Sequence, residues 1–201
     1  MKSIVCFALL CALLVSGLYT TGMALADQSA TLHQGRVTVA VPDDWQPPDS
    51  YGEDGMVLCP PDPRAWPVEV VLWPIPEGGA WTADAAAAAH EAVIGRAYPY
   101  TRRDSSAFLT TEGKRGLQVV GEVRTTSGRT VTSMFIAFVA DEYYCAIGTF
   151  SLPDRYERAL ADYLQPIARS LQLAEAGHEA PPIARPTVTD PPPAVVSSSH
   201  Q

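Results

Sequence analysis

The sequence predicts an α+β domain, in which an antiparallel sheet is flanked by helices. Four segments with the apolar and β-branched composition of strands follow one another with only short links between them. Because a parallel return needs a dozen residues or more, such links indicate antiparallel neighbours. Segments with helical periodicity stand before and after these strands, and 201 residues are enough for one domain.

Three short strands are expected before the first helix, at residues 36–41, 56–59 and 68–73. The first alternates valine with polar or small residues, which is typical of a half-buried strand. Prolines bound the third strand on both sides and limit its length. Residues 46–52 contain two prolines and a glycine, so this segment is expected to be a loop.

The first helix is expected to begin after Thr82, whose side chain suits an N-cap, and to end before Pro99. The strands of the meander are then expected at residues 106–111, 116–125, 130–140 and 143–150. A closing helix should begin near Asp154, because apolar residues recur from there at steps of three and four as far as Leu171. Pro166 is expected to kink this helix, since proline cannot donate a backbone hydrogen bond.

Residues 1–26 are expected to be a signal peptide. A lysine, an apolar run and a small-x-small ending follow one another in the order that secretion requires. The run is shorter than the roughly 20 residues that span a bilayer. A retained membrane anchor and lipidation at Cys11 are the alternatives. The folded domain is expected at residues 27–173, and residues 174–201, with six prolines, are expected to be a disordered proline-rich tail.

The charge and composition predict the compartment. A formal net charge of −8 opposes binding to nucleic acid, because affinity for a phosphate backbone comes from clustered lysine and arginine. The sequence contains no asparagine and therefore no N-glycosylation site. Together with the signal peptide, these features predict a bacterial protein of the periplasm or the cell exterior. No stable membrane insertion is expected after cleavage.

Cleavage after residue 26 would leave Cys59 and Cys145 as the two cysteines of the mature chain. In an oxidising compartment such a pair is a candidate disulfide, and the sequence predicts this bond. The alternative is two buried, unpaired thiols, because free cysteine packs as a small apolar residue.

No arrangement of residues that would carry catalysis stands out. His178 and His200 fall in the tail, and His33 and His90 lack the spacing of zinc ligands. The nucleophile-elbow, P-loop and dinucleotide-binding motifs do not occur. We therefore expect a protein that is not an enzyme, and we expect neither a metal site nor a cofactor.

Aromatic and arginine side chains are the candidates for binding a partner, because these residue types supply most of the energy at interfaces. The candidates are Trp45, Trp66, Trp81, Tyr98, Tyr100, Arg102 and Arg103. The alternatives are structural. Trp45 would then plug one end of the core, Trp66, Trp73 and Trp81 would cover the sheet edge, and residues 98–103 would be a helix exit solvated by its arginines.

The order of these elements resembles the PsbP-like superfamily. A first strand leads into Pro42 and, three residues later, Trp45, and the closing helix follows a strand at residues 144–150. Members include the extrinsic oxygen-evolving protein of photosystem II, a Ran-binding nuclear transport factor and bacterial DcrB-like envelope proteins. The resemblance spans about residues 30–173. It implies an α/β/α sandwich that serves as a binding or assembly module without catalysis, and no photosystem role is carried over.

The sequence thus predicts a non-catalytic secreted or periplasmic protein that binds a protein partner or stabilises an assembly. A small-molecule binding protein that uses a groove beside the sheet is the alternative, and a hydrolase is the third hypothesis.

The first testable prediction concerns targeting. Signal peptidase is expected to cut between Ala26 and Asp27, because Ala24 and Ala26 fill the two small-residue positions before the cut. N-terminal sequencing of the protein secreted by a bacterial host checks this. A mature chain that begins at Met1, or at a lipidated Cys11, contradicts it.

Overall fold

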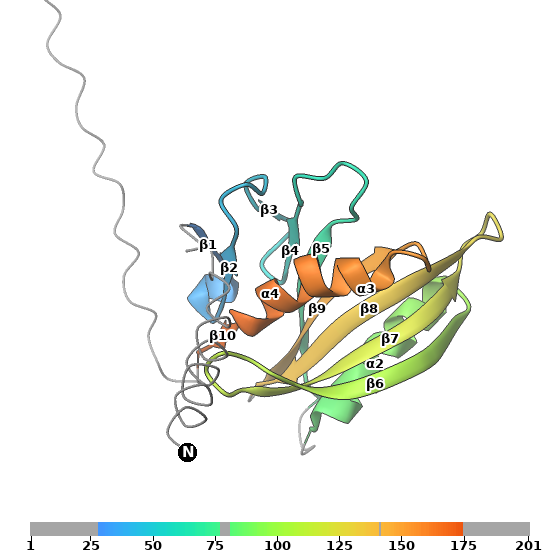
Figure 1. The fold of residues 1–201 in the computed structure, drawn as a ribbon. Helices are drawn as coiled ribbons and strands as arrows, with labels where there is room; N and C mark the ends of the chain where they lie inside the picture. The colour runs from blue at the N-terminus through green and yellow to red at the C-terminus, as the bar shows by residue number, and fades with distance from the viewer. Residues whose placement is uncertain (1–27, 77–80, 141, 175–201) are drawn as a thin grey trace, which may run out of the picture.

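The computed structural model describes residues 28–76, 81–140 and 142–174. The expected signal peptide, residues 1–26, and the expected tail beyond residue 174 lie outside the described residues. The described chain has an α+β fold, in which a seven-stranded antiparallel sheet carries helices on both faces (Figure 1). A second, three-stranded sheet completes the domain.

The large sheet has the order β3-β4-β5-β9-β8-β7-β6, and every neighbouring pair is antiparallel. Its strands are β3 (Asp49–Ser50), β4 (Gly55–Leu58), β5 (Val68–Pro74), β6 (Tyr100–Leu109), β7 (Arg115–Arg124), β8 (Thr130–Val139) and β9 (Tyr143–Ser151). The small sheet has the order β1-β2-β10, with β1 (Gln28–Leu32), β2 (Val37–Val41) and β10 (Gln172–Leu173). The predicted meander is therefore confirmed, from β6 to β9.

Two helical segments pack on opposite faces of the large sheet. On one face, α2 (Ala83–Ala97) lies mainly against β8 and β7. On the other face lies the closing helix, which is continuous through α3 (Tyr156–Ala159), a π-helical turn (Leu160–Leu164) and α4 (Gln165–Arg169). Pro166 is accommodated directly after this wider turn, in which the N–H of Gln165 donates to the carbonyl of Leu160.

The central strand β8 buries both of its faces. Met134, Ile136 and Phe138 belong to the core under the closing helix, and Phe135 and Ala137 belong to the core under α2. All five are 1% exposed or less. Because successive strand residues point to opposite faces, one strand supplies two separate cores. This explains why residues 134–139 of β8 are an uninterrupted apolar run.

The larger core lies between the large sheet on one side and the closing helix and the small sheet on the other. Leu164 and Ile167 of the helix meet the valines of β2, and each contributes about 2 kcal/mol by leaving water. Trp45 follows β2 through a turn in which its N–H donates to the carbonyl of Pro42 at 3.0 Å. Its indole meets the ring of Tyr163 edge-on at a centroid distance of 6.0 Å, so Trp45 closes one end of this core.

Alanine lets α2 lie close to the sheet. Ala86 and Ala87 are fully buried in the core that contains Phe135. The hydroxyl of Thr82 accepts a hydrogen bond from the N–H of Ala85 at 3.2 Å, so the predicted N-cap is confirmed.

Strand β6 begins at Tyr100, six residues before its expected start. Its first half is polar and exposed because β6 is an edge strand, so the alternation that marks a half-buried strand is absent. A β-bulge between Arg102 and Asp104 also interrupts the register. Strand β3 is only two residues long and lies within residues 46–52, where the prolines predict a loop.

The predicted bond between Cys59 and Cys145 is not formed, and both residues are free thiols. Cys59 follows β4, whereas Cys145 lies in β9, on the other side of β5. Continuing the pairing of β4 with β5, and of β5 with β9, places Cys59 level with Phe150. Cys145 lies five residues along β9 from Phe150 and two strand spacings from Cys59, so the two cysteines are about 20 Å apart. The Cα atoms of a disulfide lie within about 7 Å, which excludes the bond in this fold. The alternative of two unpaired thiols describes the structure.

Cys145 is expected to resist alkylation in the folded protein and to react in denaturant without any reductant. It is 0% exposed, and burial raises the pKa of its thiol to about 12, so little thiolate is present at about pH 8. Cys59 is half-buried and provides the comparison within the same chain. Mass spectrometry after iodoacetamide treatment measures both. If neither cysteine reacts in denaturant until a reductant is added, the two are bonded after all.

Candidate functional site

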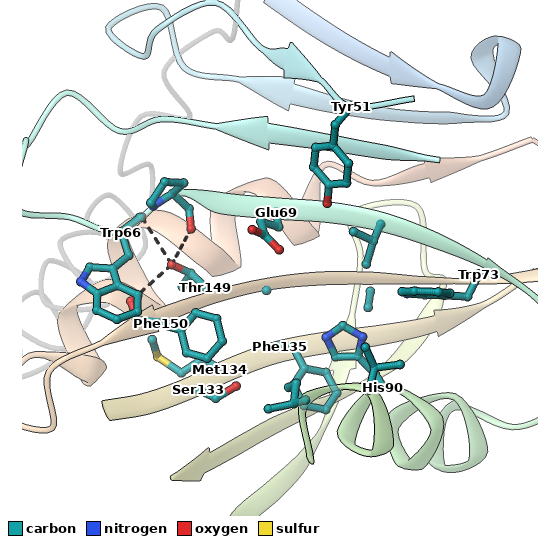
Figure 2. A pocket seen from close by; sticks show the side chains of 16 residues that line it. Tyr51, Trp66, Glu69, Trp73, His90, Ser133, Met134, Phe135, Thr149 and Phe150 are labelled. Carbon is teal, nitrogen blue, oxygen red and sulfur yellow. Dashed lines mark hydrogen bonds between the residues drawn. The ribbon is translucent and has the colours of Figure 1, made fainter. Parts of the chain in front are cut away.

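A cavity of about 480 Å³ lies on the face of the large sheet that carries α2. The helix packs mainly on β8 and β7, so the same face of β5 is left open beside it. We call this cavity the aromatic groove, and its main lining residues are Tyr51, Trp66, Glu69, Trp73, His90 and Phe150 (Figure 2).

Small residues on the floor make the groove hollow. Glu69 of β5 opposes Gly148 of β9, and Gly148 opposes Phe135 of β8. No side chain therefore stands between Glu69 and Phe135, and a Cβ atom at Gly148 would lie only 3.1 Å from the Cβ atom of Phe135. Ala146 also lines the floor and adds only a methyl group. A large residue at either position would fill the groove.

Three aromatic side chains at the rim keep much of their surface exposed. Trp66 and Trp73 are each 38% exposed, and Tyr51 is 50% exposed. Figure 2 shows the two tryptophans at opposite ends of the groove, with Glu69 and His90 between them. Exposed indole and phenol rings combine a large apolar area with a polar tip, which suits them to anchor a ligand.

Glu69 gives the groove its charge, because it is the only carboxylate among the lining residues. Burial, and to a lesser extent the charge of Glu69, raise the pKa of the Tyr51 phenol. The hydroxyl of Thr149 donates to the carbonyl of Pro67 at 2.9 Å and is therefore used within the fold. The groove is mainly apolar, with one negative charge near its middle.

His90 projects from α2 over Phe135, with the two rings edge-on at a centroid distance of 4.6 Å (Figure 2). Burial lowers the pKa of His90 to about 4, and the charge of Glu91 only partly opposes this. The imidazole is therefore neutral near pH 7. Its Nδ1 atom is buried and has no hydrogen-bond partner among the described residues.

A second cavity, of about 720 Å³, adjoins the aromatic groove. Trp66, Thr149 and Phe150 line both. We call the second cavity the arginine hollow, because its lining includes four arginines, Arg64, Arg129, Arg155 and Arg158. They come from the connection before β5, from the turn between β7 and β8, and from residues at the start of the closing helix.

The predicted tryptophans separate into three environments. Trp66 lines both cavities. Trp45 is only 7% exposed and belongs to the core, so its structural alternative is the correct description. Trp81 stacks on Tyr144 at a centroid distance of 5.6 Å and packs against the core under α2.

The predicted arginines of residues 98–103 bind other parts of the same fold. Arg102 donates two hydrogen bonds to the carboxylate of Glu91 on α2, one of them 2.7 Å from Nε to Oε1. The Glu91 side chain is only 15% exposed, so this ion pair is partly shielded from water. Arg103 donates to Glu122 of β7 at 2.6 Å. These side chains fix α2 and β6 to their neighbours and do not form a free rim.

The predicted tyrosines of this segment also differ from the expectation. The ring of Tyr100 lies over Gly121, where a Cβ atom would collide with it. Burial, followed by the nearby Glu91 carboxylate, raises the pKa of the Tyr100 phenol. Tyr98 caps the end of α2 and is 39% exposed, but it lines neither cavity.

Tyr51, Glu69 and His90 were not predicted as site residues, because they come from three segments that are far apart in the sequence. One local signal was present. In β5 the outward Glu69, Val71 and Trp73 alternate with buried apolar residues, which marks one face of that strand as open. The sequence alone could not show that α2 stops short of this face.

The described residues contain no group of three or more histidine, cysteine or acidic side chains placed to hold a metal ion. Among the helices described, none is both long and apolar enough to cross a membrane.

The described part of the chain, an antiparallel sheet with helices on both sides and a small second sheet, has a PsbP-like fold. It is similar to PsbP (CyanoP) from Synechocystis, with a TM-score of 0.55 and 14% identity over 77% of this chain and 96% of that chain. It is also similar to Mog1, seen as a point mutant, with a TM-score of 0.50 and 10% identity over 74% of this chain and 96% of that chain. No family model matches the sequence, and no curated protein matches it significantly. Likeness at these identities establishes the fold, and the function has to be argued from the site.

Stability is expected to decrease in acid because of His90. Its pKa is about 4 in the folded protein, against about 6.5 for an exposed histidine. Below about pH 6.5 the unfolded chain binds a proton that the folded chain excludes, so the free energy of unfolding falls by about 2–3 kcal/mol towards pH 4. Urea denaturation of the wild type and of His90→Gln over this range measures the effect. The variant should lack this part of the pH dependence, and parallel curves for the two proteins would contradict the assignment.

Proposed function

We propose that the protein is a non-catalytic binding protein of the bacterial envelope, and that it holds a segment of a protein partner in the aromatic groove. The observation that carries this proposal is the gathering of exposed aromatic surface. Of the six large apolar side chains exposed in the described residues, Tyr51, Trp66 and Trp73 surround this one groove. Exposed apolar surface that is clustered and rimmed by polar groups is typical of interaction sites.

The shape of the groove favours an extended polypeptide as the occupant. Trp66 and Trp73 are separated by seven residues of nearly continuous strand, so the aromatic ends of the groove lie about 20 Å apart. About six residues of extended chain cover that length. Two aromatic anchors at the ends can each receive an apolar side chain of such a segment.

The groove offers little that would catalyse a reaction. His90 is held neutral by burial, and no carboxylate among the described residues orients its Nδ1 atom. A general base of this kind is normally oriented by a third group and has a pKa near the working pH. This supports a role in binding, in line with the apolar lining. The signal peptide that the sequence predicts at residues 1–26 supports an extracytoplasmic location.

Binding of a small molecule is the second candidate function. The volume of the groove, about 480 Å³, falls within the range of pockets that enclose small ligands. A single apolar compound would fill one end of the groove and would leave the other tryptophan uncovered.

Replacing Trp66 and Trp73 together by alanine is expected to weaken capture of the partner by at least about tenfold, because the variant lacks both aromatic anchors. The tagged full chain is used to capture proteins from an envelope extract of the source organism, and the wild type and variant are compared by quantitative mass spectrometry.

Leu109→Ala is the matched control, because Leu109 is 56% exposed and lies on β6, at the opposite edge of the sheet. Proteins retained by the wild type and the control but lost from the double variant support the proposal. If the folded double variant captures the same proteins as the wild type, the groove is not the site.

A further inference from the structure

Three arginine side chains that pair with no described residue lie together in the arginine hollow. Arg64, Arg129 and Arg155 are exposed, and their guanidinium groups form no hydrogen bond or ion pair with any described residue. Arg158 makes one exposed contact with Asp162, 3.1 Å from Nε to Oδ2. Four like charges from three separate segments repel one another, so their convergence indicates a negatively charged ligand.

The local charge contrasts with that of the whole chain. The lining of the hollow contains the four arginines and only two carboxylates, Asp62 and Asp154, whereas the chain has a formal net charge of −8. Arginine binds carboxylates through two parallel N–H groups, which gives such contacts both strength and direction. The hollow is therefore complementary to an acidic group.

We propose that the arginine hollow is the second half of the binding site, and that it holds the carboxylates of an acidic segment of the partner polypeptide. This inference rests on the proposed function, because the hollow adjoins the aromatic groove, with Trp66, Thr149 and Phe150 lining both cavities. The partner segment carries apolar side chains where it lies in the groove and acidic side chains where it passes Trp66.

Glu69 determines where along the site an acidic side chain can bind. It is the only charged carboxylate in the aromatic groove, and it repels acidic side chains placed there. An acidic residue is therefore accepted at the Trp66 end and rejected in the middle of the groove. The partner is distinguished from other acidic polypeptides by having its carboxylates in one block beside an apolar stretch.

The probe is a fluorescein-labelled heptapeptide amide, Phe-Gly-Phe-Gly-Glu-Glu-Glu, together with its reversed sequence, because either chain direction could fit the groove. Two further peptides serve for comparison, one with glutamine in place of each glutamate and one with the glutamates interspersed among the phenylalanines. Fluorescence anisotropy with the full chain measures the affinity. The block peptide, in one of its two directions, should bind about three- to tenfold more tightly than the glutamine peptide, and added salt should reduce this difference.

Arg64→Gln with Arg129→Gln should reduce that difference, because it removes two of the four positive charges of the hollow. The fold should be undisturbed, since neither guanidinium group has a partner among the described residues. Arg115→Gln is the control, because Arg115 is exposed at the far end of β7 and lines neither cavity. Glu69→Gln should improve binding of the interspersed peptide and leave the block peptide unchanged.

Equal binding of the block and glutamine peptides overturns the inference, and so does unaltered binding by the double arginine variant. Inorganic phosphate that displaces the block peptide at equal or lower concentration would show a site for small anions and would also overturn it. These outcomes are distinct from failure of the proposed function. If the proposed function fails, the variant with alanine at both Trp66 and Trp73 binds the glutamine peptide as tightly as the wild type does.

Discussion

The whole structure depends on covering both faces of β8. This strand is apolar on each face, so each face needs its own layer of side chains to exclude water. The closing helix and the valines of β2 supply one layer, and the alanine face of α2 supplies the other. The two layers differ in depth. Large side chains fill the first, whereas the second is thin because alanine brings the helix backbone close to the sheet.

The position of α2 on its face explains why a groove exists. The helix is anchored to the edge strand β6 by the two hydrogen bonds from Arg102 to Glu91, and charge-assisted pairs of this kind are strong and directional. It therefore lies over the β6–β8 side of the sheet and leaves the same face of β5 to solvent. Gly148 and Ala146 then keep the uncovered floor low. One ion pair and two small residues thus account for the difference between the covered part and the open part of this face of the large sheet.

The sequence predicted the parts of this fold that have a local signal. The N-cap Thr82, the meander and the periodicity of the closing helix are each visible in a few adjacent residues. The polar first half of β6 was missed because an edge strand does not alternate. The disulfide was mispredicted because counting two cysteines says nothing about register. The aromatic candidates were predicted by residue type alone, so Trp45 in the core could not be distinguished from Trp66 at the groove. Which side chains line a cavity depends on where α2 ends up, and that is a tertiary property.

The most direct test of the account is the ¹H–¹⁵N spectrum of the indole groups, recorded with and without the partner that the wild-type protein captures. The chain has four tryptophans, and each reports from a different place. The account predicts that the signals of Trp66 and Trp73 shift on binding, while that of Trp45 in the core does not. Shifts confined to Trp81, or no shift at Trp66 and Trp73 when the partner is bound, would contradict it.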